Sequence, residues 1–180
     1  MASICVFCGS RSGAPPQYAE TARLFGTWIA NNGHRLIYGG GGTGLMGVLA
    51  DSVVAAGGDV TGIITTQLAT IELMHPGVQD MRVTSSMHER KAMMHSLADL
   101  YVALPGGFGT MEELFEAVTW AQLEIHSHPI AALNQNGVYD GLVHLIDAMT
   151  RDDFLKPKYK SLLTFTDSIP QLTAWIESVI

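Results

Sequence analysis

The sequence predicts an α/β protein with a doubly wound, Rossmann-like parallel sheet flanked by helices, built as a single domain over residues 1–180. Short β-rich apolar runs alternate with longer segments of helical period, which is typical of a parallel sheet covered by helices on both faces. The 180 residues, 47% of them apolar, suffice for one well-buried core but not for two ordinary domains. No linker, repeat or low-complexity segment interrupts the alternation.

The strands are expected where short apolar runs rich in Val, Ile and Leu occur between turn residues. The five clearest runs cover residues 4–8, 36–38, 60–64, 100–104 and 130–133. Two shorter candidates cover residues 81–84 and 162–165.

The helices are expected between these runs, where apolar residues recur with a period near 3.6. A periodic pattern locates the body of a helix better than its ends. The expected helices cover about 16–32, 44–56, 87–98, 111–126, 139–152 and 169 to the C-terminus.

The charge balance excludes some partners. A formal net charge of -7 argues against a nucleic-acid groove or an anionic membrane surface, because polyanion binding depends on many Lys and Arg side chains that release counterions. The sequence begins MASICVFCGS, without a basic region and a cleavable apolar stretch, and no apolar run approaches the length of a membrane span. We therefore expect a cytoplasmic protein that binds neither nucleic acid nor membrane.

Two cysteines, Cys5 and Cys8, form a C-x-x-C motif that is compatible with a redox pair or with half a zinc site. Their odd spacing within an expected strand sends the two side chains to opposite faces of the sheet, and no second cysteine pair completes a metal site. Buried core thiols are the favoured interpretation.

Three glycine-rich loops follow expected strands, at residues 9–13, 39–44 and 105–110. Each precedes an expected helix, so backbone N–H groups and helix dipoles can converge on one anion at the carboxyl edge of the sheet. Tight turns alone would also explain any one such loop. Three loops at one edge favour a phosphate or nucleotide site.

Ordinary nucleotide motifs fit less well. Residues 42–47 satisfy G-x-G-x-x-G, but this motif follows the second expected strand, and no acidic residue stands about 20 residues later near Gly62. A Walker loop is absent because no Gly-Lys-Ser or Gly-Lys-Thr follows the glycines.

The candidate catalytic residues are Arg90 and Glu113. A carboxylate can stabilise the oxocarbenium-like transition state of N-glycosidic cleavage, or can deprotonate the attacking water. An arginine can clamp a phosphate or ribose hydroxyl and hold the carboxylate in place. Glu112 and Glu113 also suit the first turn of any helix, and Arg90 and Lys91 could form a solvated helix face.

Four segments together resemble the Lonely Guy family of cytokinin-activating phosphoribohydrolases, long mislabelled as lysine decarboxylases. They are GGGTGLMG at 40–47, MHERK at 87–91, PGGFGTMEE at 105–113 and TWAQL at 119–123. The resemblance covers nearly the whole chain, and the P-G-G-x-G-T-x-x-E string is highly specific.

This resemblance implies hydrolysis of N6-modified adenosine 5'-monophosphates, and usually AMP itself, to the free base and ribose 5-phosphate. It assigns catalysis to Arg90 and Glu113, needs no cofactor or metal, and implies a homodimer with the site near the subunit contact. The expected substrate-binding residues are Glu72, Lys91, Gly107, Phe108, Gly109, Thr110, Met111, Glu112 and Thr119, together with Gly9, Ser10, Gly42, Thr43 and Gly44 of the other two loops.

Two departures from the family pattern are Arg11, at a commonly small position, and His128 before Pro129, where members often have lysine. His126 and His128 could be imagined as a metal pair, but a helix end and no completing ligands favour structural roles.

Two rival functions differ from a phosphoribohydrolase. A nucleotide or cofactor carrier would use the glycines but would not need Arg90 and Glu113 together. An amino-acid decarboxylase would need pyridoxal phosphate on a lysine, and only Lys91 lies in a motif.

Overall fold

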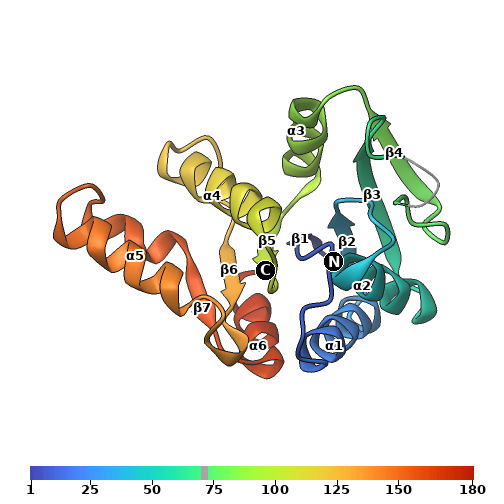
Figure 1. The fold of residues 1–180 in the computed structure, drawn as a ribbon, viewed down its shortest axis with the longest axis horizontal. Helices are drawn as coiled ribbons and strands as arrows, with labels where there is room; N and C mark the ends of the chain where they lie inside the picture. The colour runs from blue at the N-terminus through green and yellow to red at the C-terminus, as the bar shows by residue number, and fades with distance from the viewer. Residues whose placement is uncertain (70–72) are drawn as a thin grey trace.

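A computed structural model describes residues 1–69 and 73–180 of the chain. Its centre is one sheet of seven parallel strands in the order β4-β3-β2-β1-β5-β6-β7 (Figure 1). The strands are β1 (Ser3–Phe7), β2 (Arg35–Tyr38), β3 (Asp59–Thr65), β4 (Asp80–Thr84), β5 (Leu100–Ala103), β6 (Ile130–Leu133) and β7 (Thr164–Thr166).

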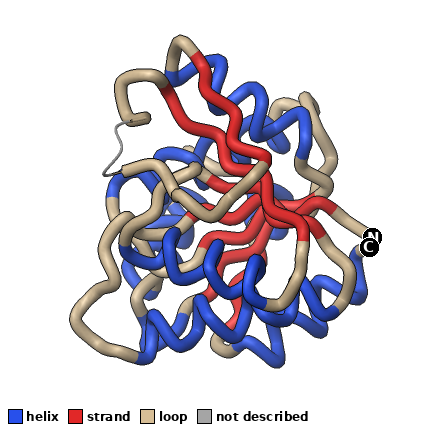
Figure 2. The backbone as a smooth tube through the Cα atoms, turned by 90° about the vertical axis from the view of Figure 1, so that its right-hand side faces the viewer, coloured by secondary structure: helices blue, strands red, loops and turns tan. Residues whose placement is uncertain are grey.

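Helices cover both faces of this sheet, as the tube in Figure 2 shows. One face packs on α1, α2 and α6, and the other on α3, α4 and α5. The α-helices are α1 (Gln17–Asn31), α2 (Gly44–Ala55), α3 (Met87–Leu97), α4 (Phe108–Gln122), α5 (Asp140–Arg151) and α6 (Ile169–Val179), with short 3₁₀ turns at Gln135–Gly137 and Pro157–Leu162. Within the described ranges, no helix is both long and apolar enough to cross a membrane.

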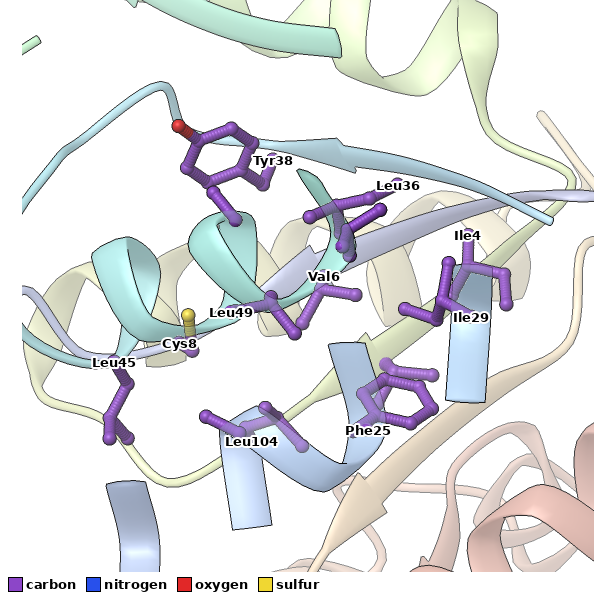
Figure 3. Close-up of a cluster of buried hydrophobic side chains, with 14 of the residues drawn as sticks. Ile4, Val6, Cys8, Phe25, Ile29, Leu36, Tyr38, Leu45, Leu49 and Leu104 are labelled. Atoms are coloured by element: carbon purple, nitrogen blue, oxygen red, sulfur yellow. The ribbon is translucent and has the colours of Figure 1, made fainter. Parts of the chain in front are cut away.

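The core has two halves because successive side chains of a strand point to opposite faces. Ile4 and Val6 of β1 pack with Phe25 of α1 and Leu49 of α2 in one half (Figure 3), whereas Phe7 packs in the other. Each large side chain buried in this way stabilises the fold by about 1.5–3 kcal/mol.

The sheet has a topological switch point between β1 and β5. From β1 the chain adds β2, β3 and β4 outward in one direction, then returns to place β5 on the other side of β1. Loops at the carboxyl ends of β1 and β5 therefore diverge to opposite faces and leave a crevice between them, where open α/β sheets bind ligands.

The predicted fold class is confirmed, and every predicted strand and helix has a counterpart in the structure. Both ends of one helix differ from the approximate prediction. Helix α4 begins at Phe108, three residues before the predicted start at Met111, because Gly107 already provides the extended N-cap residue. It ends at Gln122 and not near His126, since Glu124 has a left-handed φ of 59° that stops the helix.

The last strand was also misplaced by the sequence pattern. The prediction of 162–165 is replaced by β7 at Thr164–Thr166, because residues 157–162 turn as a 3₁₀ helix before the strand starts.

Candidate functional site

The loop after β1 is fixed between two other loops. The Gly9 N–H donates to the Pro105 carbonyl at 3.1 Å, while the Gly9 carbonyl accepts from Leu45 N at 3.0 Å and Met46 N at 3.3 Å. Gly44 has a φ of +61°, and a Cβ there would lie 2.3 Å from the Ser10 carbonyl carbon. Only glycine therefore fits at Gly44 without moving the loop.

This packing alters the predicted role of the second glycine loop. Thr43 Oγ1 donates to the Ser10 carbonyl at 3.3 Å, and Gly42 N donates to the Leu73 carbonyl at 2.7 Å. Two amides of the first turn of α2 are committed to Gly9, so this helix start offers less to an anion than its glycines predicted. Gly42, Thr43 and Gly44 support the shape of the first loop.

The loop after β5 leads directly into α4, and the first backbone N–H groups of this helix lie before its first intrahelical hydrogen bond. The first backbone bond of the helix runs from Met111 N to the Gly107 carbonyl at 3.1 Å, so the N–H groups of residues 108–110 precede it. Phe108 is 97% exposed. Such a helix start, with its positive dipole end, is suited to bind an anion.

Gly106 and Thr110 set the geometry of this helix start. A Cβ at Gly106 would lie 2.0 Å from Thr110 Oγ1, so the buried threonine hydroxyl packs directly on the glycine backbone. Beside it is a cavity of about 530 Å³ lined by residues 9–13 and 105–108, together with Tyr18, Leu45 and Val138. The cavity joins the first and third glycine loops, and its lining includes Gly9, Ser10, Gly107 and Phe108, four of the expected substrate-binding residues.

Arg90 and Glu113 form a buried ion pair between α3 and α4. Arg90 Nη1 lies 2.9 Å from Glu113 Oε1, and the two side chains are 9% and 13% exposed. Arg90 Nε also donates to the Ile63 carbonyl at 2.9 Å, and Nη2 lies 3.5 Å from the Gly39 carbonyl. The planar fork of the guanidinium is thus fixed at the carboxyl ends of β2 and β3.

The surroundings of Glu113 change its acidity. Burial raises its pKa above the ordinary value, and the positive charge of Arg90 offsets part of that rise. Glu113 does not line the 530 Å³ cavity, but it lies about one helical turn beyond Gly109 on the same helix. If the anionic group of a ligand binds the first amides of α4, the neighbouring part of that ligand therefore lies within reach of the Glu113 carboxyl.

A second ion pair lies directly beside the first. Lys91 Nζ lies 2.5 Å from Glu112 Oε1 and 2.6 Å from Glu116 Oε2. The lysine side chain is 13% exposed, whereas that of Glu112 is 55% exposed. Burial lowers the pKa of Lys91, but its bonds to the two carboxylates outweigh burial and leave that pKa raised.

The structure brings together most of the predicted site residues. Arg90, Glu113, Lys91 and Glu112 meet between α3 and α4. Met111 is half-buried and packs against the core, and Gly109 is exposed at the helix start.

Two predicted residues remain, Thr119 and Glu72. Thr119 lies further along α4 in a groove against α5, away from the Arg90 and Glu113 pair, and Glu72 lies outside the described residues.

Several residues at the site were not predicted from the sequence. Glu116 and His95 join the Lys91 contacts, and Tyr18 and Val138 line the cavity. A signal for the first two existed, since Glu116 is four residues after Glu112 and His95 is four after Lys91, which places each on the same helix face. Tyr18 and Val138 gave no comparable signal.

Both cysteines are buried, with Cys5 in one core half and Cys8 in the other, which confirms the predicted opposite faces. Burial raises the pKa of both thiols, so they stay protonated.

His126 and His128 hold the chain together after α4, where His126 Nε2 bonds to the Ala117 carbonyl at 3.0 Å and Nδ1 accepts from His128 N at 3.2 Å. In the described part of the chain, no three His, Cys, Asp or Glu side chains are grouped to hold a metal ion.

The fold and this site together define a doubly wound α/β protein with a glycine-lined cavity at its switch point and a buried arginine–carboxylate pair between α3 and α4. A family model described as "Possible lysine decarboxylase" matches residues 46–176. The chain is 41% identical over 98% of its length to "Probable cytokinin riboside 5'-monophosphate phosphoribohydrolase LOGL9" of Oryza sativa subsp. japonica, and covers 78% of that protein. It is 39% identical over 97% of its length to "Cytokinin riboside 5'-monophosphate phosphoribohydrolase LOG7" of Arabidopsis thaliana, and covers 80% of it. The chain belongs to this family of phosphoribohydrolases, as its motifs predicted.

Among solved structures, the molybdenum cofactor binding protein of Rippkaea orientalis is similar, with a TM-score of 0.73, 21% identity, and coverage of 99% of this chain and 96% of that one. At this identity the likeness establishes a shared fold and nothing about ligand or activity.

Proposed function

We propose that this protein hydrolyses the N-glycosidic bond of adenosine 5'-monophosphates, N6-modified ones and AMP itself, to the free base and ribose 5-phosphate. The observation that carries the proposal is the buried Arg90–Glu113 pair one helical turn from the first amides of α4. The names of the relatives, which are cytokinin riboside 5'-monophosphate phosphoribohydrolases, support the same reaction.

The phosphate monoester binds at the start of α4. The amides of Phe108, Gly109 and Thr110 donate to its oxygens, the Gly107 backbone and the Thr110 hydroxyl complete the contact, and the helix dipole favours its charge. Gly9 and Ser10 form the opposite wall of the same cavity. A nucleoside without phosphate lacks this anchor and is a poor substrate.

Glu113 acts on the sugar. As the bond between C1' and the base nitrogen breaks, its electron pair leaves with the base, and positive charge develops on C1' and the ring oxygen. The carboxylate stabilises that charge and takes a proton from the water whose oxygen bonds to C1'. The departing base nitrogen takes one proton from solvent and Glu113 then releases its proton to solvent, so one water is consumed and the carboxylate is regenerated. The products are the neutral base and ribose 5-phosphate.

Arg90 positions this carboxylate and does not itself act as a base, because a guanidinium stays protonated. Its bonds to the Ile63 carbonyl and to Glu113 fix one carboxylate oxygen, so the other is directed toward the substrate. Lys91, Glu112, Thr119 and Glu72 are the further substrate contacts in this proposal, with Met111 and residues 42–44 shaping the site around them.

We further propose that the protein is a cytoplasmic homodimer. Several large apolar side chains stand exposed on the α4 and α5 side, namely Phe115, Leu123, Leu145 and Phe154. Phe115 and Phe154 border a groove of about 220 Å³ that also contains Thr119. A second copy bound there would bury apolar surface whose exposure to water is unfavourable. It would also place Thr119 at a subunit contact.

The dimer is tested by light scattering during size-exclusion chromatography. The wild-type chain is expected at twice its 19.4 kDa mass, and Phe115→Glu, which puts a charge into the groove, at the monomer mass. A wild-type monomer across micromolar concentrations would contradict this part of the proposal.

The reaction is tested with purified protein and AMP, N6-isopentenyl-AMP, GMP, CMP and adenosine, by chromatography of the free base and a coupled assay for ribose 5-phosphate. We expect release from the two adenosine monophosphates and not from adenosine. Glu113→Gln is expected to lower kcat by about 10²–10⁴-fold with ligand binding retained, and the exposed control Glu124→Gln to remain active. Full activity of Glu113→Gln would remove that residue from the mechanism.

The rival function is that of a carrier that binds a nucleotide or cofactor without hydrolysis. A carrier would bind AMP at the α4 amides and release no base over many equivalents of ligand. Multiple turnovers by the wild-type chain decide between the two functions.

A further inference from the structure

A chain of bonded side chains runs from Lys91 into the protein. Lys91 Nζ contacts Glu116 Oε2 at 2.6 Å, and the other oxygen of that carboxylate, Oε1, lies 3.2 Å from His95 Nε2. His95 Nδ1 lies 2.7 Å from the Tyr101 hydroxyl on β5. One end of this chain is at the proposed substrate site, and the other is on a central strand of the sheet.

The imidazole of His95 is held in place on both sides. Its ring centroid lies 4.4 Å from the Trp120 ring and 5.2 Å from the Tyr101 ring, which it meets edge-on. The His95 side chain is 9% exposed. A ring packed in this way cannot turn to make other hydrogen bonds without losing those contacts.

The bonds also fix the tautomer of His95. Burial raises the pKa of Tyr101, so its hydroxyl keeps the proton and donates to Nδ1. A neutral imidazole then carries its proton on Nε2, which donates to the Glu116 carboxylate. Burial lowers the pKa of His95, which keeps the ring neutral near pH 7.

The charged and titratable groups around this ring come from each element packed against it. They are Lys91 on α3, Glu116 on α4, Tyr101 on β5, and His126 and His128 after α4. Of these, Glu116 raises the pKa of His95, whereas Lys91 and His128 lower it.

We propose that His95 is a positioning residue of the phosphoribohydrolase site, which acts by fixing Glu116 so that Glu116 holds Lys91 toward the substrate. This inference rests on the proposed function. Lysine has a flexible four-carbon side chain that loses much rotamer freedom when it is fixed. Glu112 is half-exposed, so a substrate anion can replace it as a partner of Lys91. Glu116 is held in place by its contact with His95.

His95→Leu removes the N–H that orients Glu116, while His95→Gln places an amide N–H at a similar reach. We expect His95→Leu to raise the KM for AMP about tenfold, the loss associated with one hydrogen bond to a charged group, with kcat changed less than about threefold. His95→Gln should restore KM to within about threefold of wild type. The control is His144→Leu, an exposed histidine on α5 that contacts none of these groups.

The double variant tests whether the effect passes through Lys91. If it does, His95→Leu adds less than about twofold to the KM of Lys91→Met, because coupled residues are not additive. Glu116→Gln, which leaves the His95 ring packed, should raise KM as His95→Leu does, so misfolding of one variant does not decide the result. Circular dichroism checks the fold of each variant.

Failure of the positioning role can be distinguished from failure of the proposed function. If the wild-type chain releases base but His95→Leu and Glu116→Gln leave KM unchanged, or if their effects multiply fully with Lys91→Met, the positioning role is overturned and the activity stands. If the wild-type chain releases no base, the proposed function fails and this inference fails with it.

Discussion

Two ion pairs lie side by side between α3 and α4, built from neighbouring residues, yet they differ in the exposure of the carboxylate and in the other partners of the cation. Arg90 and Glu113 are both buried, and the arginine is also held by the Ile63 carbonyl. Lys91 and Glu112 are one residue away on each helix, but Glu112 is half-exposed and Lys91 has a second carboxylate partner.

The difference shows how one helix contact can supply two functions. A buried pair costs stability when either partner is removed, so its geometry stays fixed through binding and reaction. An ion pair whose carboxylate is exposed, as Glu112 is, contributes little to stability and can exchange partners. We therefore assign the fixed chemistry to the first pair and the exchangeable substrate contact to the second.

The largest expected effect comes from breaking the buried pair. Arg90→Met leaves the Glu113 carboxylate buried without its cation, which should destabilise the protein by about 3–5 kcal/mol at pH 7 and abolish measurable turnover. Urea unfolding followed by circular dichroism measures the stability change.

The pH dependence of that loss has a definite sign. Burial raises the folded-state pKa of Glu113, so the folded protein binds this proton more tightly than the unfolded chain does. The stability deficit of Arg90→Met should therefore be largest at neutral pH and shrink as the pH falls toward the ordinary glutamate value of about 4.3. A deficit that grows on acidification would show that the carboxylate is not the unpaired group.

A smaller effect is expected in the pH profile of the wild-type enzyme. Since Glu113 acts in its ionised form in the proposed mechanism, kcat/KM should fall as pH decreases through its pKa, with a midpoint above the ordinary value of about 4.3. The nearby charge of Glu112 raises this pKa, so Glu112→Gln should move the midpoint to lower pH. Steady-state rates from pH 4 to 8, about the range in which carboxylates and histidines titrate, give both midpoints.

The smallest expected effect comes from changing the Lys91–Glu112 pair. Glu112→Gln should change the free energy of unfolding by less than about 0.5 kcal/mol, because a half-exposed ion pair is screened by water. Its KM for AMP should change by less than about tenfold while kcat stays near wild type. If Glu112→Gln destabilised the protein as much as Arg90→Met does, the distinction between the two pairs would be lost.

Much of the fold was predictable because its signals are local. Buried strands such as β5 and β6 are short continuous apolar runs in the sequence, and the helices show a period near 3.6. The order of the elements and the fold class could therefore be predicted. The start of α4 was missed because Gly107, Phe108 and Gly109 look like loop residues in the sequence.

The site was predictable in part. The family motifs gave Arg90, Lys91, Glu112 and Glu113, but no local pattern says which carboxylate pairs with which cation. That pairing follows from how α3 packs against α4, a contact between segments more than 20 residues apart. The partial use of the α2 amides by Gly9 is a tertiary contact of the same kind.

In the proposed mechanism, main-chain amides at the start of α4 hold a phosphate monoester while the side chain at position 113 faces the anomeric carbon. The most direct measurement is a crystal structure of the Glu113→Gln variant with AMP bound, since the slow variant preserves the substrate. We expect phosphate oxygens at hydrogen-bond distance from the amides of residues 108–110, and the substituted amide side chain beside C1' of the ribose. An AMP molecule with its phosphate seated elsewhere, or with C1' remote from position 113, would contradict this mechanism.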